Sequence, residues 1–279
     1  MATHPPVSIP GTEVRFLKSR NVDQEFRLSV ALPPGYAPGG EQRYPVLYLL
    51  DGDFSFPLAV SALRGLLLGA EVPRLIIVGI GYPSDALPDW FVSRTRDYTP
   101  TDGENLGEQM REAFPGLPEK VPGGGAGAFL SFMRDELMPF VHESYRADPD
   151  DRVFMGDSLG GLFGLYTLFH QPDTFTRYIV GSPSIWWDGA ITFAYERAFA
   201  KRSQDLAARV FMSVGSLEEP GPDDRSAAAK MVSNVREMDR ILRERKYPGL
   251  DLTTHIFDDE THLSVIPATL SRGLRVVYP

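Results

Sequence analysis

The chain has 279 residues, no cysteine and a formal net charge of -9. The lack of cysteine excludes disulfides, thiolate metal sites and a cysteine nucleophile. The negative charge argues against nucleic acid as a partner, because phosphate binding needs clustered lysine and arginine. No stretch reaches the roughly 18 apolar residues of a membrane span, and the first residues lack a signal-peptide pattern, so we expect no membrane association and a cytoplasmic location.

The length predicts a single domain over residues 1–279. Its first part reads as an antiparallel pair, "TEVRFLKS" and "EFRLSVALP", because apolar and polar residues alternate in the second of these segments. The apolar runs at 46–50 and 75–80 predict strands covered on both faces, with a helix over 58–68 between them.

The segment 81–127 is rich in proline, glycine and charge, and we expect it to be a long excursion over the surface near the active site. After it the chain alternates between helices and strands, which predicts a three-layer α/β/α sandwich with a mainly parallel central sheet. The expected elements are a helix over 128–145, the strand "RVFMG", the helix "LGGLFGLYTLFHQ", the strand "RYIVGS", a helix ending at Arg202, the strand "ARVFMSVG", a helix from Ser226 to Lys246, the strand "LTTHIFD" and a final helix.

The segment "RVFMGDSLGGLFGLYTL" carries G-x-S-x-G between a predicted strand and a predicted helix. This is the pattern of a nucleophile elbow, in which small residues permit a sharp turn that exposes the serine. Ser158 is therefore the candidate nucleophile. The N–H of Leu159, at the start of the helix, is a candidate donor to a developing oxyanion.

A serine nucleophile needs a general base, which should follow it in the chain order serine, acid, histidine. His170 ends the helix that starts at the elbow, too far along it to reach Ser158, and His255 lies inside a strand. His262 lies in a loop just past that strand and is the candidate base; read by itself, it is an exposed loop histidine.

The acid that orients the histidine should lie in "GSLEEPGPDD", after the strand "ARVFMSVG". Glu218 is favoured because it comes directly after the strand end. Glu219 remains an alternative, while Asp223 and Asp224 lie farther along and read as surface charge.

A second oxyanion donor should come from "DGDF", after the strand at 46–50, and the N–H of Asp53 is the candidate. The same D-x-D pattern, with Asp51 and Asp53, also opens phosphatase sites that use an aspartyl nucleophile and Mg²⁺. That alternative leaves the elbow, the acid and the histidine unexplained.

Two further segments offer candidate substrate-binding residues, one in the long excursion over 81–127 and one after the strand "RYIVGS". "RTRDYTPT" offers Arg94 and Arg96 as anion-binding forks and Tyr98 as a stacking or hydrogen-bonding group; alternatively, the arginines pair with neighbouring acids on the surface. In "GSPSIWW", Trp186 and Trp187 come at the carboxyl end of the sheet, so that one can line a pocket while the other packs in the core.

With these motifs in order, the chain from about Phe16 to Tyr278 resembles the esterase family of α/β-hydrolases, especially its siderophore-esterase branch, which includes enterobactin esterases. Besides the elbow and the histidine loop, the resemblance lies in "YPVLYLLDGD", "RDYTPT", "GGGAGAFLSFMRDELMPFV", "GSPSIWWD" and "SVGSLEE". It implies hydrolysis of carboxylic esters through an acyl-enzyme, with a small-molecule ester as partner and without cofactor or metal.

We therefore expect a serine carboxylesterase acting on siderophore or other acyl and aromatic esters, with Ser158, His262 and Glu218 as its triad. Two alternatives keep the same fold. One is an acyltransferase using the same triad, and the other is a non-catalytic binding protein. The sequence does not predict the oligomeric state.

Overall fold

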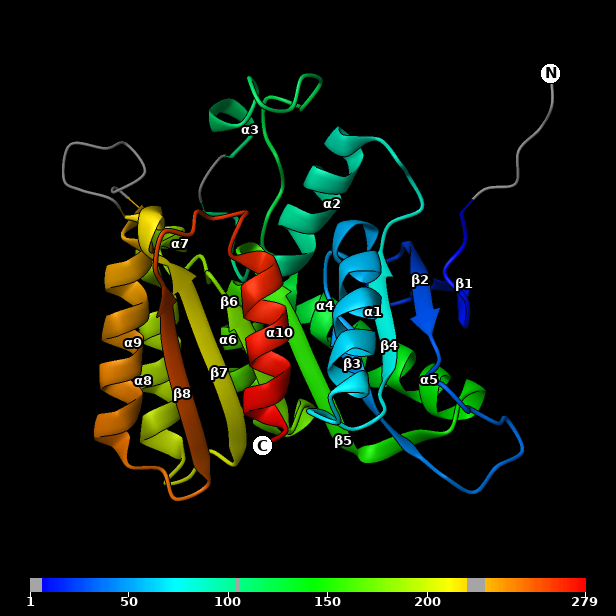
Figure 1. Ribbon diagram of the computed structural model, residues 1–279. Helices are drawn as coiled ribbons and strands as arrows, with labels where there is room; N and C mark the ends of the chain where they lie inside the picture. Colours follow the sequence, from blue (N-terminus) through cyan, green and yellow to red (C-terminus); the bar gives the residue numbers. More distant parts are fainter. Residues whose placement is uncertain (1–6, 104–105, 220–228) are drawn as a thin grey trace.

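A computed structural model describes residues 7–103, 106–219 and 229–279, and an eight-stranded sheet forms the centre of this described part (Figure 1). The strands are β1 (Thr12–Lys18), β2 (Glu25–Ala31), β3 (Tyr44–Leu49), β4 (Ile76–Gly81), β5 (Ala147–Asp157), β6 (Arg177–Gly181), β7 (Ala208–Gly215) and β8 (Leu250–Phe257). They lie in the order β1-β2-β4-β3-β5-β6-β7-β8. β2 pairs antiparallel with β1 and β4, and the strands from β4 to β8 run parallel.

Helices connect the parallel strands, as a sheet with crossover connections requires, and one more helix follows the last strand. They are α1 (Gly52–Leu68), α2 (Leu87–Tyr98), α3 (Leu106–Gln109), α4 (Ala126–Phe132), α5 (Met138–Ser144), α6 (Leu159–His170), α7 (Trp187–Ala190), α8 (Thr192–Arg202), α9 (Met231–Arg245) and α10 (Ile266–Val277). A π-helical turn, Met133–Leu137, joins α4 to α5, so the helix expected over 128–145 forms with a local widening. The expected start of a helix at Ser226 lies outside the described residues.

Side chains from the two faces of the sheet form two separate apolar cores. Along β3, Val46 and Tyr48 belong to one core and Leu47 and Leu49 to the other, because successive residues of a strand point to opposite faces. α1 and α10 cover one face, while α4, α5, α6, α8 and α9 contribute to the core on the other. This confirms the predicted three-layer α/β fold.

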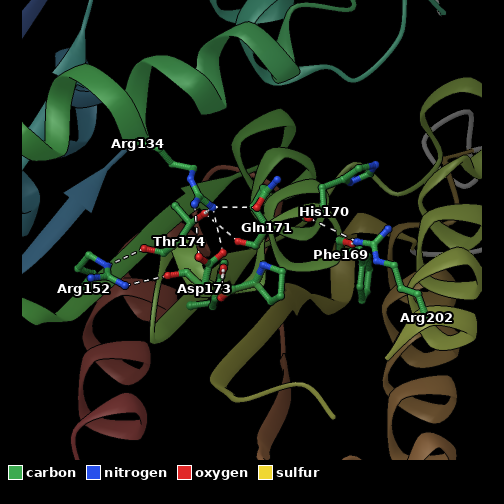
Figure 2. Close-up of polar contacts among 10 residues, drawn as sticks. Arg134, Arg152, Phe169, His170, Gln171, Asp173, Thr174 and Arg202 are labelled. Atoms are coloured by element: carbon green, nitrogen blue, oxygen red, sulfur yellow. Dashed lines mark hydrogen bonds and ion pairs between the residues drawn. The ribbon is translucent and has the colours of Figure 1, made fainter. Parts of the chain in front are cut away.

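Three arginines bind the carboxyl-terminal end of α6 and the turn Pro172–Thr174 that follows it (Figure 2). Arg152 donates to the backbone oxygens of Asp173 and Thr174, and Arg134 forms an ion pair with the Asp173 carboxylate. Arg202 donates to the last carbonyl oxygens of the helix. Positive charge at this end also complements the helix dipole. α6 is therefore anchored at the end opposite Ser158.

The prediction that 81–127 is an excursion over the surface is wrong for its first part, which contains a partly buried helix. Residues Leu87–Tyr98 form α2, which packs against α4 and α6. Its buried positions, Phe91, Arg94, Thr95, Asp97 and Tyr98, have helical spacing. The helix escaped prediction because two of these buried residues are charged, so the apolar period that marks an amphipathic helix is interrupted.

Candidate active site

Ser158 occupies a sharp turn between β5 and α6. Its backbone, with φ 60° and ψ -120°, lies in a region that residues with a side chain rarely adopt. A side chain at Gly156 would place its Cβ 2.6 Å from the backbone oxygen of Gly160, so the turn requires glycine there. The strained serine and its small neighbours have the geometry of a nucleophile elbow.

Backbone hydrogen bonds hold this turn against the next strand. The Ser158 N–H donates to the Gly181 oxygen at 3.0 Å, and the Ser158 oxygen accepts the Ser184 N–H at 3.1 Å. The hydroxyl of Ser158 lies 3.4 Å from the hydroxyl of Ser184. Ser184 therefore contacts the candidate nucleophile through both its backbone and its side chain.

Glu218 and His262 form a pair at the same edge of the sheet. Glu218 belongs to the turn Ser216–Glu218 after β7 and is only 4% exposed, while His262 lies in the loop between β8 and α10. His262 Nδ1 lies 2.5 Å from Glu218 Oε2. The other carboxylate oxygen accepts hydrogen bonds from Ser182 Oγ at 2.5 Å and from the Gly215 N–H at 2.8 Å.

The alternative acid Glu219 binds a different partner from His262. Both carboxylate oxygens of Glu219 bind Ser233, one through its N–H at 2.7 Å and one through its hydroxyl at 2.6 Å. Glu219 thus ties the turn to the first turn of α9. Asp223 and Asp224 lie outside the described residues.

The carboxyl group of Asp157, next to the nucleophile, lies within electrostatic reach of the other candidate groups. Burial raises its pKa to about 7, and the negative charge of Asp51 adds to the rise. Smaller effects on the same pKa come from His262, Arg94 and Glu218. The charges of these groups therefore act on the same carboxyl group, while the Ser158 hydroxyl and the His262 imidazole are not hydrogen-bonded to each other. Catalytic hydrogen bonds are often long in the absence of substrate and tighten when it binds.

Two helix starts lie side by side at this place. β3 and β5 are neighbouring parallel strands, paired at Leu49 and Met155, and each leads directly into a helix. Asp53 therefore lies in the first turn of α1 and Leu159 in the first turn of α6. N–H groups in a first turn have no acceptor within their own helix, so they remain available to an anion.

The carboxylates of the D-x-D segment are both engaged by arginines. Asp51 forms two hydrogen bonds with Arg94, at 2.8 and 3.1 Å. Asp53 binds Arg27 at 2.6 Å and accepts the Tyr82 N–H at 3.0 Å. A phosphatase of the kind considered above needs these carboxylates as nucleophile and Mg²⁺ ligand, and the ion pairs oppose both roles.

The candidate substrate-binding residues of α2 make internal contacts. Arg94 is 7% exposed and Tyr98 is fully buried. The Tyr98 hydroxyl oxygen accepts a hydrogen bond from the backbone N–H of Asp51 at 3.3 Å. Arg96 is half-buried and binds Asp97 and Gln24, each at 2.7 Å. Neither arginine is therefore a free anion-binding fork on the surface.

The two tryptophans differ in their surroundings. Trp187 is fully buried, and its indole N–H donates to Thr101 Oγ1 at 3.0 Å. Trp186 is half-buried, with its ring centre 5.9 Å from that of Trp187. Trp187 thus joins the sheet edge to the segment after α2, and Trp186 is the one that solvent reaches.

Sequence reasoning missed Ser182 and Ser184, which contact the candidate acid and the candidate nucleophile. The available signal was their position in "GSPS", directly after β6, at the edge where strands of α/β proteins present ligand-binding residues. It also missed that Arg94 pairs with Asp51, since no local pattern joins the two segments.

The mainly parallel sheet and the elbow between β5 and α6 define an α/β-hydrolase. Residues 19–259 match the family described as "Putative esterase", so the chain belongs to this esterase family of ester hydrolases. It is 32% identical over 281 residues to the ferri-bacillibactin esterase BesA of Bacillus subtilis, covering 96% of this chain and 90% of the relative.

Solved structures agree with this assignment. The BES protein from Bacillus cereus superposes with a TM-score of 0.82 at 27% identity, over 100% of this chain and 99% of the other. The siderophore hydrolase EstA from Aspergillus nidulans gives a TM-score of 0.81 at 25% identity, over 98% and 97% of the two chains. Within the described residues, no helix combines the length and apolar character needed to cross a membrane.

Proposed function

We propose that the protein is a serine carboxylesterase that works through an acyl-enzyme, with Ser158 as nucleophile, His262 as general base and Glu218 as the acid that orients it. The observation that carries this proposal is the 2.5 Å contact between Glu218 and His262, at the sheet edge where Ser158 occupies the strained elbow.

The chemistry follows from these positions. Ser158 Oγ bonds to the ester carbonyl carbon as its proton passes to His262 Nε2, and the carbonyl oxygen becomes an oxyanion. The N–H groups of Asp53 and Leu159 donate to that oxyanion. When the C–O bond breaks, the imidazolium returns its proton to the departing alcohol. Water then attacks the acyl-enzyme with the same assistance, releasing the acid and free Ser158.

Glu218 keeps the imidazole in the form that this cycle needs. An ionised carboxylate accepts a hydrogen bond, so Nδ1 carries the proton and Nε2 is left to act as the base. The Ser182 hydroxyl and the Gly215 N–H fix the carboxylate in turn.

We further propose that the natural substrate is an ester-linked siderophore. The support is the likeness, over nearly the whole chain, to proteins named ferri-bacillibactin esterase and siderophore triacetylfusarinine C esterase, the latter from Aspergillus fumigatus at 28% identity. The half-buried Trp186, two residues beyond Ser184, is our candidate for contacting the substrate. The substrate-binding roles expected of Arg96 and Tyr98 have less support, because both side chains are bound within the protein.

The proposal is tested by a hydrolysis screen of p-nitrophenyl esters of several acyl lengths, aryl esters and siderophores with ester linkages. We expect turnover without added metal and labelling of Ser158 by an organophosphonate. An absence of both would favour a non-catalytic binding protein. Preferential transfer of the acyl group to an added alcohol or amine would favour an acyltransferase, and turnover of aryl phosphates that depends on Mg²⁺ would favour the phosphatase.

A further inference from the structure

Arg94 makes three hydrogen bonds beneath the candidate active site. Its Nε and Nη2 atoms donate to the two carboxylate oxygens of Asp51, at 2.8 and 3.1 Å, and Nη2 also donates to the backbone oxygen of Asp157 at 3.1 Å. The arginine side chain is 8% exposed and the Asp51 side chain 12% exposed. The guanidinium is therefore held within the protein and is not presented to solvent.

The two partners of Arg94 belong to the two halves of the proposed oxyanion site. Asp51 precedes the first turn of α1, which carries the Asp53 N–H, and it has a left-handed backbone with φ 51°. The Asp157 oxygen belongs to the peptide group that leads into Ser158 and, after it, Leu159. One side chain from α2 thus connects the loop after β3 with the elbow after β5.

Further contacts hold the guanidinium in this place. It lies 5.3 Å from the centre of the Trp90 ring and 5.5 Å from that of Tyr98. The Tyr98 hydroxyl accepts the Asp51 N–H at 3.3 Å. Side chains of α2 therefore bind both the carboxylate and the backbone of Asp51. Rings at this distance stabilise a cation that has lost its water.

A buried ion pair is weak evidence for stability, because the cost of removing both charges from water offsets much of their attraction. The geometry offers another reason for this pair. Only arginine presents a planar fork that binds both oxygens of a carboxylate and has a further N–H for the carbonyl. Such a group sets the distance between the two segments it joins.

We propose that Arg94 is a positioning residue, which through Asp51 and the Asp157 carbonyl sets the spacing between the Asp53 and Leu159 N–H groups so that both reach the same oxyanion. The inference rests on the proposed esterase function. It replaces the role of substrate-binding fork that the sequence suggests for Arg94.

The test compares kcat and KM for a p-nitrophenyl ester in the wild type, Arg94→Met, Arg94→Lys, Asp51→Asn and the double variant Arg94→Met with Asp51→Asn. We expect kcat of Arg94→Met and of Asp51→Asn to fall by about 10² relative to the wild type, with KM changed only a few-fold. This is the order of loss seen when one oxyanion donor is removed. Arg94→Lys should not restore kcat, because an ammonium cannot bind in the same fork geometry. The double variant should lose little more than either single variant, because both act through one contact.

A matched control is Arg245→Met. Arg245 also forms a two-pronged pair with a fully buried carboxylate, that of Glu196, at 2.7 and 2.9 Å. It ends α9 shortly before β8 begins, at the edge of the sheet opposite the candidate site. Its loss should lower the melting temperature and leave kcat unchanged.

The outcomes are separable. A wild type that neither hydrolyses esters nor is labelled at Ser158 overturns the proposed function and this inference together. An active wild type with full kcat in folded Arg94→Met overturns the positioning role alone. If Arg94→Met does not fold, Arg94→Lys and Asp51→Asn decide, and full kcat in both overturns it. A large rise in KM at constant kcat would assign Arg94 to substrate binding instead.

Discussion

His262 Nδ1 lies 2.5 Å from Oε2 of Glu218, although 44 residues separate the two in the chain. The second carboxylate oxygen is occupied by the Ser182 hydroxyl and the Gly215 N–H. Among the described residues, the two carboxylate oxygens of Glu218 thus bind different partners, one the histidine and the other Ser182 and Gly215, and His262 Nε2 forms no hydrogen bond there.

Replacing Ser158 by alanine removes the proposed nucleophile. We expect kcat for ester hydrolysis to fall by about 10⁶, as in other serine hydrolases, with the cooperative melting of the protein retained. Ser184→Ala is the matched control, because its hydroxyl lies 3.4 Å from that of Ser158 without being the proposed nucleophile. If the folded Ser158→Ala protein kept most of its turnover while Ser184→Ala lost it, the nucleophile would be Ser184.

Glu218→Gln and Glu219→Gln form a matched pair of neighbouring substitutions. The first removes the charge that orients His262 and stabilises its protonated form, so we expect a loss of about 10² to 10⁴ in kcat. The second weakens only the contact with Ser233 and should leave kcat within a few-fold of the wild type. Steady-state kinetics on the two purified proteins check this, and the reverse pattern would make Glu219 the acid.

His262→Ala should lower kcat about as much as loss of the serine, because the proton of Ser158 then has no acceptor. The wild-type kcat/KM should fall on acidification, since a protonated imidazole cannot act as a base, and this dependence should vanish in the variant. His170→Ala and His255→Ala are controls, because His170 lies at the far end of α6 and His255 contacts Arg272. An unchanged pH profile in His262→Ala would remove the histidine from the mechanism.

Asp157 should make the stability of the protein depend on pH. Burial raises its pKa to about 7, and its Oδ1 has no hydrogen-bond partner among the described residues. In the unfolded chain an aspartate titrates near ~3.9, so the folded state binds the proton more tightly. The resulting stabilisation is complete below the unfolded pKa and is lost as the pH rises through about 7.

The neutral variant Asp157→Asn escapes this loss. We compare the denaturant midpoint of the variant with that of the wild type at two pH values. The difference in favour of the variant should be larger near about pH 8 than near about pH 4, where both side chains are uncharged in the folded protein. Urea unfolding at the two pH values measures the difference. An equal offset between the two proteins at both pH values would show that the Asp157 carboxyl is not perturbed.

The sequence by itself determined the elbow, because the turn depends on residues within five positions of one another. Gly156 and Gly160 meet across that turn, so their spacing from Ser158 is visible in the chain as a local pattern. The sequence also predicted the strands β3 and β4, because strands buried on both faces need continuous apolar runs. The proposed order of serine, acid and histidine along the chain is the one that the α/β-hydrolase fold requires.

Only the tertiary structure decided which of the charged and aromatic side chains are buried. Arg94 and Asp97 lie on the buried side of α2, where apolar residues are expected, so the helix and its contacts escaped prediction. The structure also separates Trp187, in the core, from the half-buried Trp186, although the two are neighbours in the chain. The partner of Arg94 lies 43 residues away, in Asp51. A charge can be buried only where folding brings an opposite charge to it, and that pairing depends on distances in space that spacing along the chain does not encode.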